Sequence, residues 1–332
     1  MQTVSQPDGR GAPGAAAVAG RAARRMLAVA VLAVPLAAPP RALAQDPAPD
    51  QAGVRPTHRT ALVRVVDDSV KSAALSGRWM KYRVLLPATY DAGARRYASL
   101  YLLHGYGGAF SNWETHTRLA DHLAPYDLVI VLPEGENSYY VNATAFPAER
   151  FETYIQDDLV KDVEGKYRVM PARYARAIGG LSMGGYGALK FGLRRPAQFA
   201  VAGSMSGAVG AGRSVAATAA PSEPASPAQV AARERTNALL GPPGSPERAR
   251  NDLFALVDSS DAGKLPYLYL DCGTEDGLLD VNREFAALLL RRKAAYEYHE
   301  LPGGHTWDYW DRRVVAFLDV LSRRIPMGGP PH

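Results

Sequence analysis

A rhythm of short, largely apolar runs separated by helix-patterned segments constrains this chain most. Strands are expected at residues 61–66, 82–87, 100–103, 128–133, 175–179, 199–204, 268–270 and 296–299. Residues 151–166, 184–193 and 281–292 carry apolar side chains at helical spacing between them. Strands that are apolar on both faces are buried on both sides, and their alternation with helices is typical of parallel sheets. We therefore expect an α/β fold, with helices covering both faces of a mostly parallel central sheet.

The first 44 residues have the parts of a cleavable export signal in their usual order. Arg21, Arg24 and Arg25 precede an apolar run over residues 26–38, and small residues flank position 43. A basic region, a short apolar region and a small-residue cleavage site direct secretion. We expect residues 1–44 to be removed, which leaves a secreted or periplasmic protein beginning at Gln45. An alanine-rich extension or an uncleaved anchor is the alternative, and the Sec and twin-arginine routes both stay open.

Composition divides the rest of the chain. Residues 45–58 are polar and contain proline, which indicates a linker; residues 59–326 form the folded domain, and residues 327–332 are a tail. Within the domain, residues 208–249 are rich in Ala, Ser and Pro, so we expect an insertion there, as a cap or a mobile loop.

The net charge of the chain is +5, and the sequence contains no long Lys/Arg run. We therefore expect no nucleic-acid partner.

Residues 180–184, with the sequence GLSMG, form the most informative motif. They follow an expected strand and open an expected helix, which is the setting of a nucleophile elbow. A tight strand-to-helix turn exposes the Ser182 hydroxyl, and the flanking glycines avoid collisions with neighbouring elements. The competing interpretation is a glycine-rich turn that only packs a helix onto a strand.

A serine nucleophile needs a base, because a free hydroxyl attacks poorly at neutral pH. Of the seven histidines, His305 lies in a loop directly after the last expected strand, within the sequence PGGHTW. Loops at the carboxyl ends of parallel strands are where such sites form. His305 is the predicted base, whereas His104 is expected to shape its own loop.

The base needs a carboxylate that orients the imidazole. Residues 271–277, with the sequence DCGTEDG, follow the preceding strand. Asp276 is the predicted acid, and Glu275 and Asp271 are its competitors. The order serine, acid, histidine along the chain is that of α/β hydrolases.

Two backbone N–H groups must face the negative charge that develops on the substrate oxygen. Met183, directly after the serine, is expected to supply one. The glycine-containing loop of residues 104–108 is expected to supply the other, because glycines let the backbone approach a substrate closely.

Together, these segments resemble the esterase D/antigen 85-type branch of α/β hydrolases, and particularly its tributyrin esterase-like bacterial members. The matching stretches are residues 102–108, 180–188, 271–276 and 303–307. The resemblance implies the α/β-hydrolase fold, with Asp276 as the acid and Tyr106 as the second oxyanion N–H. It also implies that Trp113, Tyr139 and Tyr140 line or support the acyl pocket. The insertion at 208–249 departs from the family pattern, and the signature of formylglutathione hydrolases around the oxyanion loop is absent.

The resemblance implies hydrolysis of carboxylic esters with short acyl, hydroxycinnamoyl or sugar groups. An acyltransferase of the antigen 85 type, which moves an acyl group to a sugar, is the first alternative. A non-catalytic secreted binding protein is the second. No metal-ligand or phosphate-binding motif occurs in the sequence, so we expect neither a metal nor a cofactor. The oligomeric state stays open.

Overall fold

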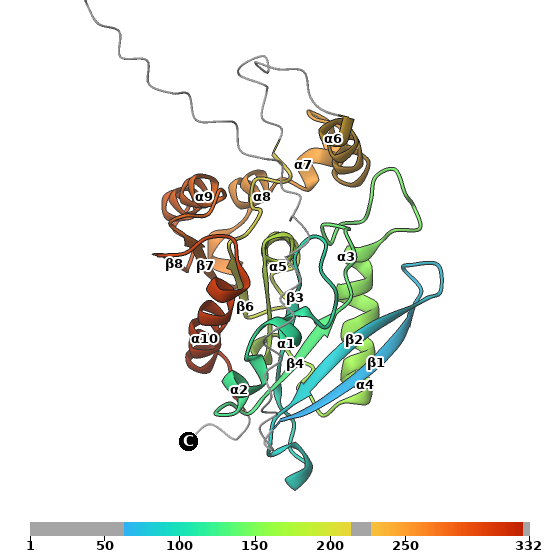
Figure 1. Cartoon of the computed structure of the whole chain (residues 1–332), viewed down its shortest axis with the longest axis vertical. Coiled ribbons are helices and arrows are strands. Elements are labelled where there is room, and N and C mark those ends of the chain that lie inside the picture. The colour runs from blue at the N-terminus through green and yellow to red at the C-terminus, as the bar shows by residue number, and fades with distance from the viewer. Residues whose placement is uncertain (1–62, 214–226, 328–332) are drawn as a thin grey trace, which may run out of the picture. The chain divides into compact units, whose positions relative to one another are not determined.

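The computed structural model describes residues 63–213 and 227–327 (Figure 1). The expected signal, the linker and almost all of the tail lie outside the described residues. Eight strands form one sheet in the order β1-β2-β4-β3-β5-β6-β7-β8. Their bounds are β1 Arg64–Ser72, β2 Arg78–Leu86, β3 Ala98–Leu103, β4 Leu128–Pro133, β5 Arg176–Leu181, β6 Val201–Met205, β7 Tyr267–Gly273 and β8 Tyr296–Leu301.

Strands β3 to β8 run parallel to one another, while β2 is antiparallel to both β1 and β4. The sheet is therefore mixed and mostly parallel, and it has the α/β-hydrolase fold, as the sequence predicted. Its carboxyl edge brings together the ends of β3, β5, β6, β7 and β8, which is where ligands bind in open α/β sheets.

Helices cover both faces of the sheet (Figure 1). One face carries a continuous helix made of α3 Phe151–Thr153, η2 Tyr154–Leu159 and α4 Val160–Lys166, together with α5 Met183–Arg194, α8 Leu253–Ser259 and α9 Leu279–Arg291. The other face carries α1 Asn112–His116, α2 Leu119–Leu123 and α10 Trp307–Arg324. Short 3-10 turns lie at Tyr90–Ala92, Arg173–Ala175 and Ala262–Lys264.

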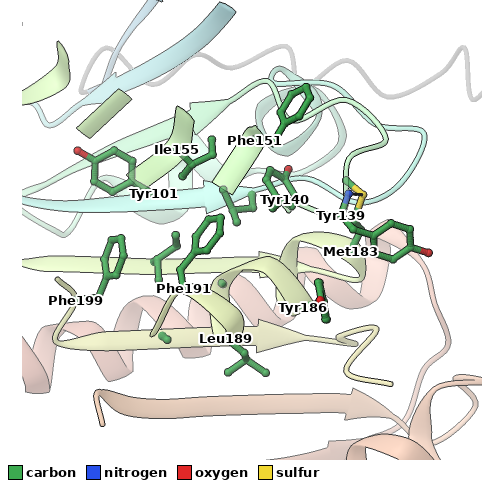
Figure 2. Close-up of a cluster of buried hydrophobic side chains, with 14 of the residues drawn as sticks. Tyr101, Tyr139, Tyr140, Phe151, Ile155, Met183, Tyr186, Leu189, Phe191 and Phe199 are labelled. Carbon is green, nitrogen blue, oxygen red and sulfur yellow. Dashed lines mark hydrogen bonds between the residues drawn. The ribbon is translucent and has the colours of Figure 1, made fainter. Parts of the chain in front are cut away.

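Each buried strand faces two apolar cores, which is why its sequence is apolar without alternation. In β3, Tyr101 and Leu103 pack on the α5 side, whereas Leu100 and Leu102 pack on the α10 side. Figure 2 shows the α5-side core, where aromatic side chains from strands and from α5 meet. This packing fixes the start of α5 against the sheet.

The main differences from the sequence expectation lie in three regions, and helix α8 was not expected either. Helix α10 was not expected; its buried side chains recur at helical spacing but alternate with charged ones. The first hairpin is longer, since β1 reaches Ser72 through a half-exposed edge strand that does not need an apolar sequence. The segment expected as an insertion contains α6 Pro227–Leu240 and α7 Pro246–Arg250, with residues 214–226 outside the described part.

Candidate active site

Ser182 lies in a sharp turn between β5 and α5. Its backbone has φ 52° and ψ −117°, a conformation that non-glycine residues adopt at a cost of about 1–3 kcal/mol. Such strain persists where the surrounding packing enforces it, and it turns the serine hydroxyl out of the sheet. The serine is 6% exposed. The geometry is that of the nucleophile elbow expected from the GLSMG sequence.

Two glycines make this turn possible. A Cβ on Gly184 would lie 2.5 Å from the backbone oxygen of Leu103, at the end of β3. A Cβ on Gly180 would lie 2.5 Å from the backbone carbonyl carbon of Gly184. Both distances are shorter than a real contact allows, so any side chain at either position would push α5 away from the sheet. The glycines therefore place the first turn of α5 directly against the loop that follows β3.

His305 lies between Ser182 and Asp276. Its Nε2 is 3.0 Å from the Ser182 Oγ, and its Nδ1 is 2.8 Å from the Asp276 Oδ2. The imidazole follows β8, in a loop where Gly303 has φ 137°, a value that favours glycine. The three side chains that the sequence singled out, from loops far apart in the chain, thus form one hydrogen-bonded series.

Asp276 occupies the position beside the imidazole, and its two competitors do not. Its side chain is 1% exposed, and its Oδ1 also accepts a hydrogen bond from the Leu278 N–H at 2.9 Å. Glu275 is exposed to solvent. Asp271 is fully buried in β7, where it accepts a hydrogen bond from Tyr269 and pairs with Arg313.

The environment keeps Asp276 ionised. Burial raises the pKa of this carboxyl, but the hydrogen bond and charge of His305, together with the Leu278 N–H, outweigh burial and leave the pKa below its ordinary value. A carboxylate accepts hydrogen bonds and cannot donate one, so Nδ1 of His305 carries a proton toward Asp276. In the neutral imidazole, Nε2 is then free to accept the Ser182 proton.

The two predicted oxyanion donors lie at the junction of the β3 loop and α5. Met183 is the first residue of α5, and the first N–H groups of a helix have no partner within it. Among the described residues, neither the Met183 N–H nor the Tyr106 N–H donates a hydrogen bond. Both groups thus lack a partner in the described part of the chain, and their role at the oxyanion stays a prediction.

His104 fixes the shape of that loop from within. It is 1% exposed, with its Nδ1 2.8 Å from the Gly105 carbonyl oxygen. Its Nε2 accepts a hydrogen bond from the Gly135 N–H at 2.9 Å. The ring thus ties the end of β3 to the end of β4. His104 therefore shapes its own loop, as predicted from the sequence.

Trp113 and Tyr140 hold the same loop by its carbonyl groups. The Trp113 indole N–H donates to the Leu103 oxygen at 2.9 Å, and the Tyr140 hydroxyl donates to the His104 oxygen at 3.0 Å. Both side chains are buried. Tyr139 lies beside Met183 (Figure 2). The centroid of its ring is 5.9 Å from that of the Tyr106 ring. Contact between these three residues and a substrate stays a prediction.

Two tryptophans next to His305 were not singled out from the sequence. The buried Trp310 ring lies edge-on to His305, with ring centroids 4.9 Å apart. Trp307, which is half-buried, packs edge-on against Trp310 at 5.2 Å and Trp113 at 5.7 Å. The WDYW sequence begins two residues after His305, but the contact of its rings with the imidazole depends on where α10 packs.

Neither a metal site nor a membrane span emerges from the described residues. In residues 63–213 and 227–327, no group of His, Cys, Asp or Glu side chains has the arrangement of a metal site. No helix in the same part of the chain is both long and apolar enough to cross a membrane.

Known proteins match most of the domain. The family model named Esterase matches residues 72–319. An acetyl esterase of Caldicellulosiruptor saccharolyticus is 28% identical over 235 residues, covering 70% of this chain and 86% of that protein. Esterase Rv1288 of Mycobacterium tuberculosis is 30% identical over 248 residues, covering 68% of this chain; the match spans 52%, about half, of that relative's length.

Two further matches bear on chemistry and fold. The diacylglycerol acyltransferase/mycolyltransferase Ag85A of Mycobacterium tuberculosis is 24% identical over 278 residues, covering 73% of this chain and 78% of that protein. The solved structure of a ferulic acid esterase superimposes with a TM-score of 0.65 at 26% identity, covering 80% of this chain and 99% of that one.

Proposed function

The chain belongs to the Esterase family, within the esterase D/antigen 85-type α/β hydrolases, and is a carboxylic esterase of the serine hydrolase class; on that premise we propose that it works through an acyl-enzyme on Ser182. The observation that carries this proposal is the hydrogen-bonded series Ser182–His305–Asp276, with the serine on a strained elbow. Membership of this family leaves no support for a non-catalytic binding protein.

The proposed reaction begins with proton transfer. His305 Nε2 takes the Ser182 proton as Oγ attacks the ester carbonyl carbon, and Asp276 stabilises the imidazolium that forms. The N–H groups of Met183 and Tyr106 hold the tetrahedral oxyanion. His305 then gives its proton to the departing alcohol, which leaves the acyl group on Oγ. Water, activated by the same imidazole, releases the acid and restores Ser182.

The proposed substrates are esters of acetyl or other short acyl groups and of hydroxycinnamic acids, attached to sugars or simple alcohols. The acetyl esterase and ferulic acid esterase likenesses support these two acyl classes. The aromatic surroundings of His305, with Trp307 only half-buried, support an acyl group that packs against rings.

A panel of esters tests the acyl class and the nucleophile together. Turnover of p-nitrophenyl esters of increasing chain length, methyl ferulate and acetylated sugars is measured for the wild type and for Ser182→Ala. The variant is expected to lose about 10⁴–10⁶ in kcat while keeping its fold. Ser259→Ala, at an exposed serine, is the matched control and is expected to match the wild type. More than about a tenth of wild-type activity in Ser182→Ala would place the nucleophile elsewhere.

Acyl transfer is the second candidate, and the likeness to Ag85A favours it. The same three side chains serve both reactions, since a sugar hydroxyl replaces water in the second half. Product analysis with and without an added sugar acceptor separates them. We expect free acid as the main product in both cases. Acylated sugar as the main product would make this chain an acyltransferase.

We also propose that the enzyme is exported, because residues 1–44 have the composition of a cleavable signal. Mass spectrometry of protein from the culture fluid or periplasm is expected to find an N-terminus at Gln45. An intact Met1 in a membrane fraction would contradict export with cleavage.

A further inference from the structure

A buried ion pair between β7 and α10 takes no part in the proposed chemistry. The Asp271 carboxylate is fully buried, and its Oδ2 accepts hydrogen bonds from the Tyr269 hydroxyl at 2.6 Å and from the Arg313 Nε at 3.3 Å. A second guanidinium nitrogen of Arg313 donates to the Tyr269 hydroxyl oxygen at 2.7 Å. The Arg313 side chain is 12% exposed. The three side chains form a closed ring of polar contacts between β7 and α10.

The position of this ring in the chain links two catalytic loops. Asp271 lies in β7, whose end leads into the loop that carries Asp276. Arg313 lies in α10, which begins two residues after His305. The ion pair therefore joins the strand that supports the acid to the helix that supports the base.

The two loops also touch directly and leave little room for adjustment. The Thr274 N–H donates to the Leu301 oxygen at 2.9 Å, and the Glu275 N–H donates to the Gly303 oxygen at 3.0 Å. A Cβ on Gly273 would lie 2.1 Å from the Gly303 oxygen. A shift of α10 on β7 would thus move the His305 loop against the acid loop.

Burying Asp271 and Arg313 costs free energy, because two charged groups leave water. Filling the same space with apolar side chains would avoid that cost. Burial raises the pKa of Asp271, and the charge of Arg313 with the Tyr269 hydrogen bond opposes that rise; Tyr309 faces the same carboxyl. Apolar side chains of similar volume often stabilise a fold as well as a buried ion pair does. Unlike apolar contacts, an ion pair fixes one relative position of its two elements, because its hydrogen bonds break when the partners move.

We propose that Asp271 and Arg313 are positioning residues of the esterase reaction, and that their ion pair holds α10 on β7 where the His305 Nδ1 reaches Asp276. This inference rests on the proposed Ser182–His305–Asp276 mechanism. Neither residue touches the substrate; both act through the placement of the imidazole. A displacement of about 1 Å at a reacting group can cost a factor of about 10² in rate.

The test compares Arg313→Met with the double variant Asp271→Asn/Arg313→Met. The single variant leaves a buried, unpaired carboxylate, so it is expected to lose thermal stability as well as activity. The double variant removes both charges while its side-chain amide oxygen still accepts from Tyr269, so its Tm is expected to recover. Its kcat is expected to stay about ten- to a hundredfold below wild type, with KM within about twofold. Arg323→Met, at an exposed ion pair of the same helix, is the matched control and keeps wild-type kcat.

The acid limb of the pH profile separates positioning from a through-space charge effect. An imidazole that loses its carboxylate contact holds its proton less tightly, so positioning predicts a limb at lower pH in both variants. If Arg313 acted only through its distant positive charge, its removal would make the imidazole hold its proton more tightly and would move the limb to higher pH. The groups in direct contact with His305 are Asp276, Ser182 and the Trp310 ring.

Each outcome decides the inference. A low kcat with recovered Tm and a limb at lower pH in the double variant supports it. A double variant with wild-type kcat overturns it, and so does an acid limb that moves to higher pH in Arg313→Met. Either result leaves the mechanism intact, provided that Ser182→Ala is inactive. Activity in Ser182→Ala would instead overturn the proposed function and this inference with it.

Discussion

At the scale of single residues, the proposed chemistry depends on one tautomer of the His305 imidazole. Asp276 is buried, ionised and able only to accept, so it holds the His305 proton on Nδ1. The Nε2 lone pair then faces the Ser182 hydroxyl.

The choice between the adjacent carboxylates is testable by neutral substitution. Asp276→Asn is expected to keep the fold and to lower kcat by up to about 10⁴, because the amide favours the wrong imidazole tautomer. Glu275→Gln is the matched control, since Glu275 is exposed, and is expected to cost less than about tenfold. Steady-state kinetics of both variants make the comparison. The reverse ranking would move the acid to Glu275.

The pH dependence of the rate reports on the base. Only a neutral imidazole accepts the serine proton, so kcat/KM is expected to rise through the range where imidazoles lose a proton, about pH 6.5 in peptides. Asp276 stays ionised throughout that range, because its pKa is below the ordinary carboxyl value. The limb therefore belongs to histidine. Flat activity between about pH 5 and 8 would count against a histidine base.

At the scale of elements, the elbow depends on how closely α5 approaches β3. The sequence predicted much of this region: β4 has the expected bounds, and α5 extends the expected helix by one residue at each end. Such buried elements are predictable because both their faces are apolar. Helix α10 was missed although its buried side chains recur at helical spacing, because charged residues lie between them in the sequence. The second half of β1 was missed because an edge strand tolerates the acidic pair Asp67 and Asp68.

The close packing of the elbow predicts what a methyl group added at Gly184 would do. Gly184→Ala is expected to destabilise the fold by about 1–3 kcal/mol, because the Cβ would meet the backbone oxygen of Leu103. Activity is expected to fall further than stability explains, since the collision displaces the oxyanion loop. Thermal unfolding and kcat of the folded variant measure the two effects.

Gly165→Ala is the matched control for that substitution. Gly165 is an exposed helical glycine, and its Cβ would meet nothing within 4 Å. Alanine there is expected to add up to about 1 kcal/mol of stability without changing activity. Equal behaviour of the two variants would show that the contact with Leu103 does not constrain the elbow.

At the scale of the whole molecule, the sheet gathers loops from distant parts of the chain at one edge. The three side chains of the hydrogen-bonded series, Ser182, Asp276 and His305, could be selected from the sequence because each follows a recognisable strand. The aromatic wall of Trp307 and Trp310 could not, because it depends on where α10 packs. The same holds for the ion pair of Asp271 and Arg313, whose partners are far apart in sequence.

The integrity of this core can be followed through Cys272, the only cysteine of the chain. The thiol is buried in β7, and burial raises its pKa, with the nearby Asp276 and Asp271 adding to the rise. It is therefore expected to resist iodoacetamide in the native protein and to take up one label in guanidinium chloride, as counted by mass spectrometry. Rapid labelling of the active native enzyme would show that β7 is open to solvent.

The central claim is that Ser182 forms the covalent intermediate, and a fluorophosphonate tests it most directly. The reagent is incubated with the folded enzyme, and the adduct is located by peptide mass spectrometry. We predict one adduct, on Ser182, formed in step with the loss of esterase activity and absent from Ser182→Ala. An inactivated enzyme that carries its adduct on another residue, or a folded enzyme that is not labelled at all, would contradict the account.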